Sequence, residues 1–241
     1  MADPHLVLLG YGVADSLQFT IEAQRAIGRA TTVYAIAPPP SLAAHLKSLR
    51  IKLVDLAERL ATGPEGALDV ADFLLRRAAL EPPAVLISPG NPLFLNSVAR
   101  LLLQAANERS IAVTLVPGVS VLDTVISDLG LDVTTRGLQI FEARHLLGLR
   151  HQPNPRVPLL VLEMGALPLG FPQAEPAAVH HAFHDHLAAH YPAEHAVTLI
   201  TETTGRGAFA RKTVHLRDLP TILHDAPTDS TLFLDIVPKA P

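Results

Sequence analysis

Short apolar runs alternate along the first half of the chain with segments whose apolar residues recur at helical spacing. The run from Leu6 to Leu9 stops at Gly10 and Gly12, and a helical period follows from about residue 18 to about residue 29. We predict further strands at residues 31–36, 84–88 and 111–116. We also predict helices at residues 41–49 and 65–79, and two more helices that end near residues 108 and 130. Strands that alternate with helices in this way indicate a mostly parallel sheet covered by helices.

The pattern changes after residues 148–158, which read GLRHQPNPRVP and contain three prolines but no period. We place a boundary there, between an N-terminal lobe of residues 1–147 and a C-terminal lobe of residues 148–241. In the second lobe we predict strands at residues 159–163, 195–201, 212–216 and 231–237, and one helix at residues 177–190. Because strands outnumber helices here, we expect a mixed sheet in this lobe and an α/β fold with two lobes.

The composition fits a packed globular protein and excludes several classes of function. Hydrophobic residues make up 49% and charged residues 17% of the 241 residues, which leaves too little charge for extended disorder. Nineteen Lys and Arg against 23 Asp and Glu give a net charge of -4 without a basic run, so we expect no nucleic-acid partner. The absence of cysteine excludes disulfides, thiolate metal sites and a cysteine nucleophile.

The amino terminus, MADPHLVLLGYG, lacks the basic start and the long apolar stretch of a signal peptide. No later segment reaches the roughly 18 uninterrupted apolar residues that a membrane helix needs. We therefore expect a soluble, cytoplasmic protein without a membrane partner.

Three strand-to-helix turns combine glycine with small or polar residues: GYGVAD from Gly10, SPGNP from Ser88 and PGVS from Pro117. In an α/β sheet, ligands bind beyond the carboxyl ends of the strands, where glycine lets the backbone approach a ligand and helix amino termini present N–H groups. One glycine at such a turn commonly serves only to accept a positive φ. Three such turns in one chain indicate a ligand cleft.

The sequences of these turns exclude the common nucleotide sites. The first turn lacks the third glycine of a dinucleotide fingerprint, and no acidic residue ends the predicted second strand at Ile36. The chain has neither a G-x-x-x-x-G-K-[ST] phosphate loop nor a G-x-S-x-G nucleophile elbow. What remains is a nucleotide-like ligand that is not held by its phosphates, and S-adenosylmethionine, with an adenosine and an amino-acid tail, fits that description.

Several segments resemble a known enzyme family. The pair VLISPGNPLF and VTLVPGVSVLDTVISDLGLDV resembles the G-D-P and P-G-[IV]-S segments of the tetrapyrrole (corrin/porphyrin) methylase superfamily, and LLGYG is similar to its first glycine turn. The runs DLGLDVTTRGLQIFEARHLL, LLVLEMG, HYPAEHAVTLITE and STLFLDI look most like the borosin branch, whose members are peptide α-N-methyltransferases. The resemblance extends from about Leu6 to Ile236.

The resemblance implies a two-lobe α/β methyltransferase, usually a homodimer, with S-adenosylmethionine in the cleft between the lobes. The positions that match the family's cofactor contacts are Gly90, Asn91 and Phe94 for the methionine part, Ser120 and Val121 beside the methionine tail, Val13 after the first turn, and Met164, Glu202, Thr203 and Thr231 around the adenosine. Asn91 stands where many members have Asp, so it keeps a carbonyl oxygen for an ammonium group but gives up the charge attraction.

The chain departs from the borosin pattern where the acceptor would be activated. Borosin enzymes carry Tyr and Arg residues before the G-D-P-like turn, whereas this chain has no tyrosine between Tyr34 and Tyr191. Pro89 stands where those enzymes have a further tyrosine. A backbone amide is a poor nucleophile that needs help in losing its proton. We therefore favour N- or O-methylation of a small metabolite or natural-product intermediate. The alternatives are methylation of a peptide backbone, and an inactive module that binds the cofactor or a peptide.

Methyl transfer from a sulfonium depends mainly on holding the acceptor in line, so it does not require a dedicated base. If a base exists, the candidates are Tyr11, Tyr34 and His145. Eleven Phe and Tyr residues and two Met residues leave few side chains to stack on a large planar acceptor such as a corrin. The sequence leaves open the identity of the acceptor and the choice among N-, O- and C-methylation.

Six histidines lie in or beside one predicted helix: His180, His181, His184, His186, His190 and His195. The pairs 180/184 and 186/190 have the spacing that places two imidazoles on one helix face, as a metal site requires. The spacing supplies no third ligand, and an exposed polar face explains the run equally well. We expect no physiological metal.

Overall fold

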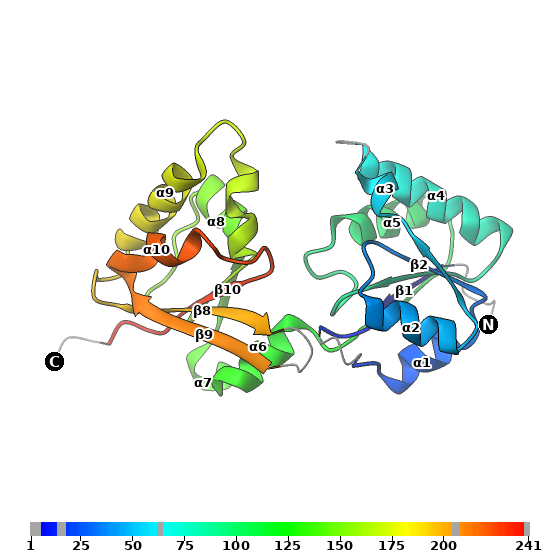
Figure 1. The fold of residues 1–241 in the computed structure, drawn as a ribbon, viewed down its shortest axis with the longest axis horizontal. Helices are drawn as coiled ribbons and strands as arrows, with labels where there is room; N and C mark the ends of the chain where they lie inside the picture. Colours follow the sequence, from blue (N-terminus) through cyan, green and yellow to red (C-terminus); the bar gives the residue numbers. More distant parts are fainter. Residues whose placement is uncertain (1–5, 14–17, 62–64, 204–207, 239–241) are drawn as a thin grey trace. The chain divides into compact units, whose positions relative to one another are not determined.

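The computed structural model describes residues 6–13, 18–61, 65–203 and 208–238, which form two compact units (Figure 1). The first unit runs through Ser127 and the second begins at Asp128. The second unit thus begins before the boundary expected at residue 148, because β6 (Gln139–Glu142) pairs in parallel with β7 (Leu159–Leu162) and so belongs to the second sheet.

A five-stranded, wholly parallel sheet forms the centre of the first unit, in the order β3-β2-β4-β1-β5. Its strands are β1 (Leu6–Gly10), β2 (Thr32–Ala35), β3 (Lys52–Asp55), β4 (Ala84–Ser88) and β5 (Val113–Val116). Every residue of β1 and β4 is buried, as expected of inner strands with helices on both faces.

Helices cover both faces of this sheet (Figure 1). They are α1 (Ile21–Ile27), α2 (Pro40–Ser48), α3 (Ala57–Leu60), α4 (Gly66–Leu80) and α5 (Ser97–Glu108). A further helix, α6 (Val121–Leu129), contains the boundary between the two units. On α4, Val70, Leu74 and Ala78 recur at helical spacing and pack with α5 on one face, whereas α1 and α2 contribute to the core on the other face. A buried Leu or Val side chain contributes about 1.5–3 kcal/mol, so these two cores are the main source of the unit's stability.

A mixed five-stranded sheet forms the second unit, in the order β6-β7-β10-β8-β9. β6 and β7 are parallel, and the pairs of β10 with β7, β10 with β8, and β8 with β9 are antiparallel. The other elements are β8 (Ala196–Thr203), β9 (Ala208–His215), β10 (Thr231–Leu234), α7 (Val133–Arg136), α8 (Ala143–Gly148), α9 (Pro176–Ala188), α10 (Leu219–Leu223), and the 3-10 helices η1 (Met164–Gly170) and η2 (Leu216–Asp218). Side chains of α8, α9, α10 and η1 form the main core of this unit.

The predicted fold class is confirmed, with a parallel sheet followed by a mixed one, but the pattern missed several elements. β3 and β6 were not predicted, and both are four-residue strands at sheet edges. The loop expected after Glu163 is instead the 3-10 helix η1, which contains Pro168. The strand expected at residues 231–237 ends at Leu234.

Candidate functional site

The three glycine turns follow three neighbouring strands of the first sheet. β1 lies between β4 and β5, all three run in the same direction, and Gly10 is in register with Ser88. The carboxyl ends of parallel strands lie at the same sheet edge, so the turns that begin at Gly10, Ser88 and Pro117 are brought together, as the sequence predicted.

Backbone hydrogen bonds link the turns to one another. The N–H of Tyr11 donates to the carbonyl oxygen of Ser88 at 3.0 Å, and that of Gly90 donates to the oxygen of Gly12 at 3.1 Å. The N–H of Gly118 donates to the oxygen of Gly90 at 3.2 Å. The second turn is therefore bonded to both of the others, and the three form one rigid backbone surface.

Two glycines are required because the turns approach so closely. A Cβ on Gly10 would lie 1.8 Å from the carbonyl oxygen of Gly90 and 2.5 Å from the nitrogen of Gly118. A Cβ on Gly118 would lie 2.8 Å from that same oxygen. Contacts this short with backbone atoms cannot be relieved by moving a side chain, so these positions exclude any side chain.

Glycine is needed at position 90 for a different reason, because the backbone there has a φ of +59°. A Cβ there would lie 3.4 Å from Cα of Ser120 and 3.7 Å from Cγ1 of Val13, both ordinary contacts. Three positions expected to contact the cofactor, Val13, Gly90 and Ser120, therefore lie together around one left-handed residue.

Asn91 and Phe94 form the turn that leads toward α5. The Oδ1 atom of Asn91 accepts a hydrogen bond from the N–H of Leu93 at 3.0 Å, and its carbonyl oxygen accepts one from the N–H of Phe94 at 3.0 Å. Asn91 is half-buried and closes an Asx turn of the kind that Asp also forms. One lone pair of its amide oxygen is used locally, and the second is available to a ligand.

The third turn ends in a reciprocal cap that the sequence analysis missed. The N–H and Oγ of Ser120 donate to Oδ2 of Asp123 at 2.7 and 2.8 Å, and the N–H of Asp123 lies 3.4 Å from Oγ of Ser120. The sequence signal was the S-x-x-D spacing before an apolar run, which is a variant of the capping box. Ser120 is thus fixed at the start of α6, next to Val121.

Ser88, at the end of β4 where the second turn begins, has a buried hydroxyl with no hydrogen-bond partner among the residues that the structure describes. Its residue is 8% exposed. A buried hydroxyl without a partner is destabilising, typically by about 1–3 kcal/mol, and such groups call for an explanation.

In the second unit, the positions expected around the adenosine gather at one edge of the mixed sheet. β10 is antiparallel to both β7 and β8, so its first residue, Thr231, lies beside the carboxyl ends of those strands. The N–H of Met164, just after β7, donates to the carbonyl oxygen of Ser230 at 2.9 Å. Glu202 and Thr203 end β8 near the same edge, and their side chains lie outside the described part of the structure.

The family model for Tetrapyrrole (Corrin/Porphyrin) Methylases matches residues 5–206 of this sequence. The chain belongs to the tetrapyrrole methylase family. Two curated fungal relatives are methyltransferase/ribosomally synthesized borosin cyclic peptide precursors, of type III from Anomoporia bombycina and type I from Coprinopsis marcescibilis. They are 25% and 26% identical over 68% and 66% of this chain, which spans only 19% and 42% of their lengths.

Solved structures of this methylase family share the fold. The uroporphyrin-III C-methyltransferase of Thermus thermophilus aligns with 95% of the chain and 93% of its own chain, at a TM-score of 0.66 and 19% identity. A cobalt precorrin-4 methyltransferase aligns over 95% of this chain and 94% of its own, at a TM-score of 0.66 and 13% identity. The Thermus enzyme has also been crystallised with S-adenosyl homocysteine. The predicted family and its fold are confirmed.

Of the three candidate bases, Tyr11 and Tyr34 lie on opposite faces of the first sheet, and His145 belongs to the second unit. Tyr11 continues the first turn and packs against the core on the α1 and α2 face. Tyr34 is 3% exposed on the other face, where its hydroxyl accepts a hydrogen bond from Nε of Arg77 at 2.9 Å. Arg77 is in the last turn of α4, which leads into the amino end of β4, so this hydroxyl is directed away from the turns.

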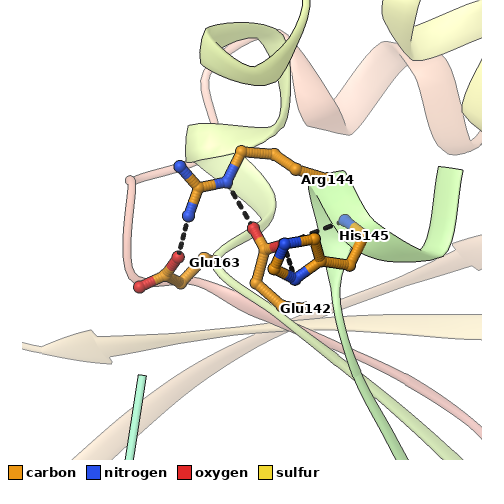
Figure 2. Close-up of polar contacts among 4 residues, drawn as sticks. All are labelled: Glu142, Arg144, His145 and Glu163. Carbon is orange, nitrogen blue, oxygen red and sulfur yellow. Dashed lines mark hydrogen bonds and ion pairs between the residues drawn. The ribbon is translucent and has the colours of Figure 1, made fainter. Parts of the chain in front are cut away.

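His145 belongs to a polar cluster of the second unit, shown in Figure 2. Its side chain is 72% exposed, and its Nδ1 lies 3.2 Å from Oε2 of Glu142. Arg144 pairs with both Glu142 and Glu163. Burial raises the pKa of Glu142, but hydrogen bonds from Arg144 and from the amides of His145 and Arg144 outweigh it, so the pKa lies below its usual value. Burial raises the pKa of Glu163, and this effect exceeds the opposing attraction of Arg144.

The six histidines from His180 to His195 lie on and after α9, and their side chains have different surroundings. His180 is buried, which lowers its pKa, and His184 pairs with Asp185 at 2.8 Å. Nε2 of His186 contacts the carbonyl oxygen of His151 at 2.8 Å. Among the residues that the structure describes, no three His, Cys, Asp or Glu side chains are grouped to hold a metal ion. Likewise, no described helix is long and apolar enough to cross a membrane.

Proposed function

We propose that this chain is an S-adenosylmethionine-dependent methyltransferase whose three linked turns hold the methionine part of the donor. Members of its family use S-adenosylmethionine. The observation that carries the proposal is the meeting of Val13, Gly90 and Ser120 around one left-handed glycine, at the carboxyl edge of a parallel sheet. That edge is where ligands bind in open α/β sheets.

The residues at this edge fit an amino-acid group. The second lone pair of Asn91 Oδ1 can accept a hydrogen bond from an ammonium. At the amino end of α6, the carboxylate of Asp123 already accepts from the N–H and Oγ of Ser120. The hydroxyl of Ser88 supplies a further polar group, which has no partner within the described part of the chain. In the second unit, we assign Met164 and Thr231, which are both buried, to the surroundings of the adenosine, together with Glu202 and Thr203.

When bound, the donor supplies a methyl group on a positively charged sulfur, which is already activated toward a nucleophile. The chain's own contribution is to hold the acceptor atom in line with that methyl group and to exclude water. A nitrogen or oxygen acceptor forms the new bond to carbon, the carbon–sulfur bond breaks, and the acceptor's proton passes to solvent or a nearby base.

For the acceptor we propose a small metabolite or natural-product intermediate that is methylated on nitrogen or oxygen. The support is that Tyr34 is buried and bonded to Arg77, and that Pro89, not a tyrosine, precedes Gly90. An amine or hydroxyl acceptor needs less activation than a backbone amide.

A peptide backbone acceptor is the second candidate, and the two borosin precursors among the relatives favour it. Cytoplasmic location and a homodimer are parts of the same proposal. Sedimentation of the purified chain tests the dimer.

The proposal is tested by calorimetry with S-adenosylmethionine and S-adenosyl homocysteine, followed by transfer assays with labelled donor. We expect both ligands to bind at micromolar to millimolar concentration. The assays compare small amines and phenols with unstructured peptides. Failure of both ligands to bind at millimolar concentration would show that the donor assignment is wrong, and transfer to peptide backbones alone would replace the metabolite with the second candidate.

A further inference from the structure

Arg144 joins the ends of two strands, through Glu142 and Glu163 (Figure 2). Met164 directly follows Glu163. Nε of Arg144 donates to Oε1 of Glu142 at 2.5 Å, and its Nη2 donates to Oε2 of Glu163 at 2.8 Å. Glu142 is the last residue of β6 and Glu163 follows the last residue of β7. Because β6 and β7 are parallel, their ends lie side by side, and one guanidinium spans both.

The aliphatic part of Arg144 contacts the far end of the helix that follows Glu163. A Cβ on Gly170, the last residue of η1, would lie 2.8 Å from Cγ and 3.0 Å from Cβ of Arg144. The guanidinium thus holds the residue that precedes η1, while the stem packs against the residue that ends it. Arg144 therefore contacts the chain at both ends of η1.

Glu163 is held in an unfavourable backbone conformation, with φ 58° and ψ 43°. Residues with a side chain rarely adopt this left-handed region, and they keep it only where surrounding contacts enforce it. The change of direction at Glu163 takes the chain from β7 into η1 and presents the N–H of Met164 to the carbonyl oxygen of Ser230. Ser230 directly precedes Thr231.

We propose that Arg144 is a positioning residue of the donor site: by holding Glu163 in its left-handed conformation, it sets the backbone of Met164 and Thr231 at the place assigned to the adenosine. This inference rests on the proposed function, which assigns those two residues to the donor. Glu142 strengthens the arrangement because its side chain is only 6% exposed and also accepts a hydrogen bond from the N–H of His145, which fixes the start of α8.

The first test measures the Kd for S-adenosyl homocysteine by calorimetry. Arg144→Ala should weaken binding by about tenfold, within the range of coupling energies between residues in contact. Arg144→Lys keeps the charge and most of the stem but has no forked donor, so it should weaken binding by roughly threefold. Arg76→Ala removes an exposed arginine from the ion pair with Asp72 on α4 and should leave the Kd unchanged.

The second test separates a role through the backbone from direct contact by the carboxylate. Glu163→Gly loses the carboxylate but accepts a left-handed backbone, whereas Glu163→Ala loses the carboxylate and is strained. We expect Glu163→Gly to bind within about threefold of the parent and Glu163→Ala to bind more weakly. In the Glu163→Gly background, Arg144→Ala should cost less affinity than in the parent.

The outcomes distinguish the inference from the function on which it rests. If the parent fails to bind S-adenosyl homocysteine, both are overturned. If the parent binds and folded Arg144→Ala binds equally well, only the inference is overturned. Should Arg144→Ala not fold by circular dichroism, Arg144→Lys decides, and an unchanged Kd for that variant overturns the proposal. Equal weakening by Glu163→Gly and Glu163→Ala also overturns it.

Discussion

Gly10 and the carbonyl oxygen of Gly90 are separated by less space than a single methyl group needs. A Cβ on Gly10 would lie 1.8 Å from that oxygen, and the nitrogen of Gly118 donates to the same oxygen at 3.2 Å. The turns after three strands are therefore packed backbone against backbone, so the shape of the proposed donor site depends on the absence of side chains.

We expect Gly10→Ala to push the turns apart, because neither neighbour can move as a side chain does. The free energy of unfolding should fall by about 1–3 kcal/mol or more, and the affinity for S-adenosyl homocysteine should be lost. Gly28→Ala is the control, since Gly28 has a φ of -63° and a Cβ there would make only ordinary contacts. That variant should be unchanged or more stable by about 0.4–1 kcal/mol in urea titration. Equal stability of the two variants would contradict the packing argument.

Gly90→Val tests the left-handed residue at the centre of the proposed site. The strain of a side chain at φ +59° should lower stability by about 1–2 kcal/mol, and the new side chain should abolish binding of S-adenosyl homocysteine. Gly130→Val matches the strain, because Gly130 has a φ of +62°, but a Cβ there meets nothing within 4 Å. It should lose similar stability and retain binding. If both variants bind equally, the donor does not approach Gly90.

Tyr34→Phe distinguishes a structural phenol from a catalytic base. Removal of the hydroxyl leaves Nε of Arg77 without its 2.9 Å acceptor, so the free energy of unfolding should fall by about 1 kcal/mol. The dependence of kcat on pH should not change, because this hydroxyl is directed away from the turns. Loss, in Tyr34→Phe, of a rise of kcat with increasing pH that the parent shows would return Tyr34 to the list of bases.

The two carboxylates that share Arg144 should have opposite effects on the pH dependence of stability. Burial raises the pKa of Glu163 in the presence of Arg144, Glu142 and His145, so its ionisation costs stability as the pH rises through that pKa. The parent should therefore lose stability relative to Glu163→Gln as the pH rises above the usual pKa of a glutamate carboxyl. The pKa of Glu142 is lowered, chiefly because hydrogen bonds from Arg144 outweigh burial, so its contribution is present at neutral pH and is lost as the pH falls.

Urea titrations of both variants between about pH 3 and pH 7 check this pair. Glu142→Gln should be less stable than the parent at neutral pH and should approach it in acid. If the parent instead gains stability relative to Glu163→Gln as the pH rises, the attraction of Arg144 has a larger effect on the pKa of Glu163 than burial has.

The sequence predicted the inner strands and the glycine turns because each has a local signal. β1 and β4 are continuous apolar runs that end in glycine or proline. The edge strands β3 and β6 have four residues each and carry charged or polar ends, such as Lys52 and Glu142, so no apolar run marks them. Their pairing depends on the neighbouring strand.

Other features of the site are not local. The contact of Gly10 with Gly90 depends on β1 lying beside β4, a strand order that no turn sequence encodes. The bridge from Glu142 to Glu163 through Arg144 depends likewise on the parallel pairing of β6 and β7. Residues far apart in sequence meet at these points, which is why spacing alone identified the turns but neither their contacts nor Arg144.

Asn91→Asp tests whether the second turn binds an ammonium group. The Asx turn to the N–H of Leu93 should persist, because Asp accepts that hydrogen bond as Asn does. A carboxylate adds charge to a hydrogen bond from an ammonium and roughly doubles its strength, so KM for S-adenosylmethionine should fall by about two- to fivefold. Asn96→Asp adds the same charge at the amino end of α5, where Asn96 accepts from the N–H of Ala99, and serves as the matched control. A gain shared equally by both variants would point to the net charge of the first unit, whereas a gain confined to Asn91→Asp places the donor's ammonium group at this turn.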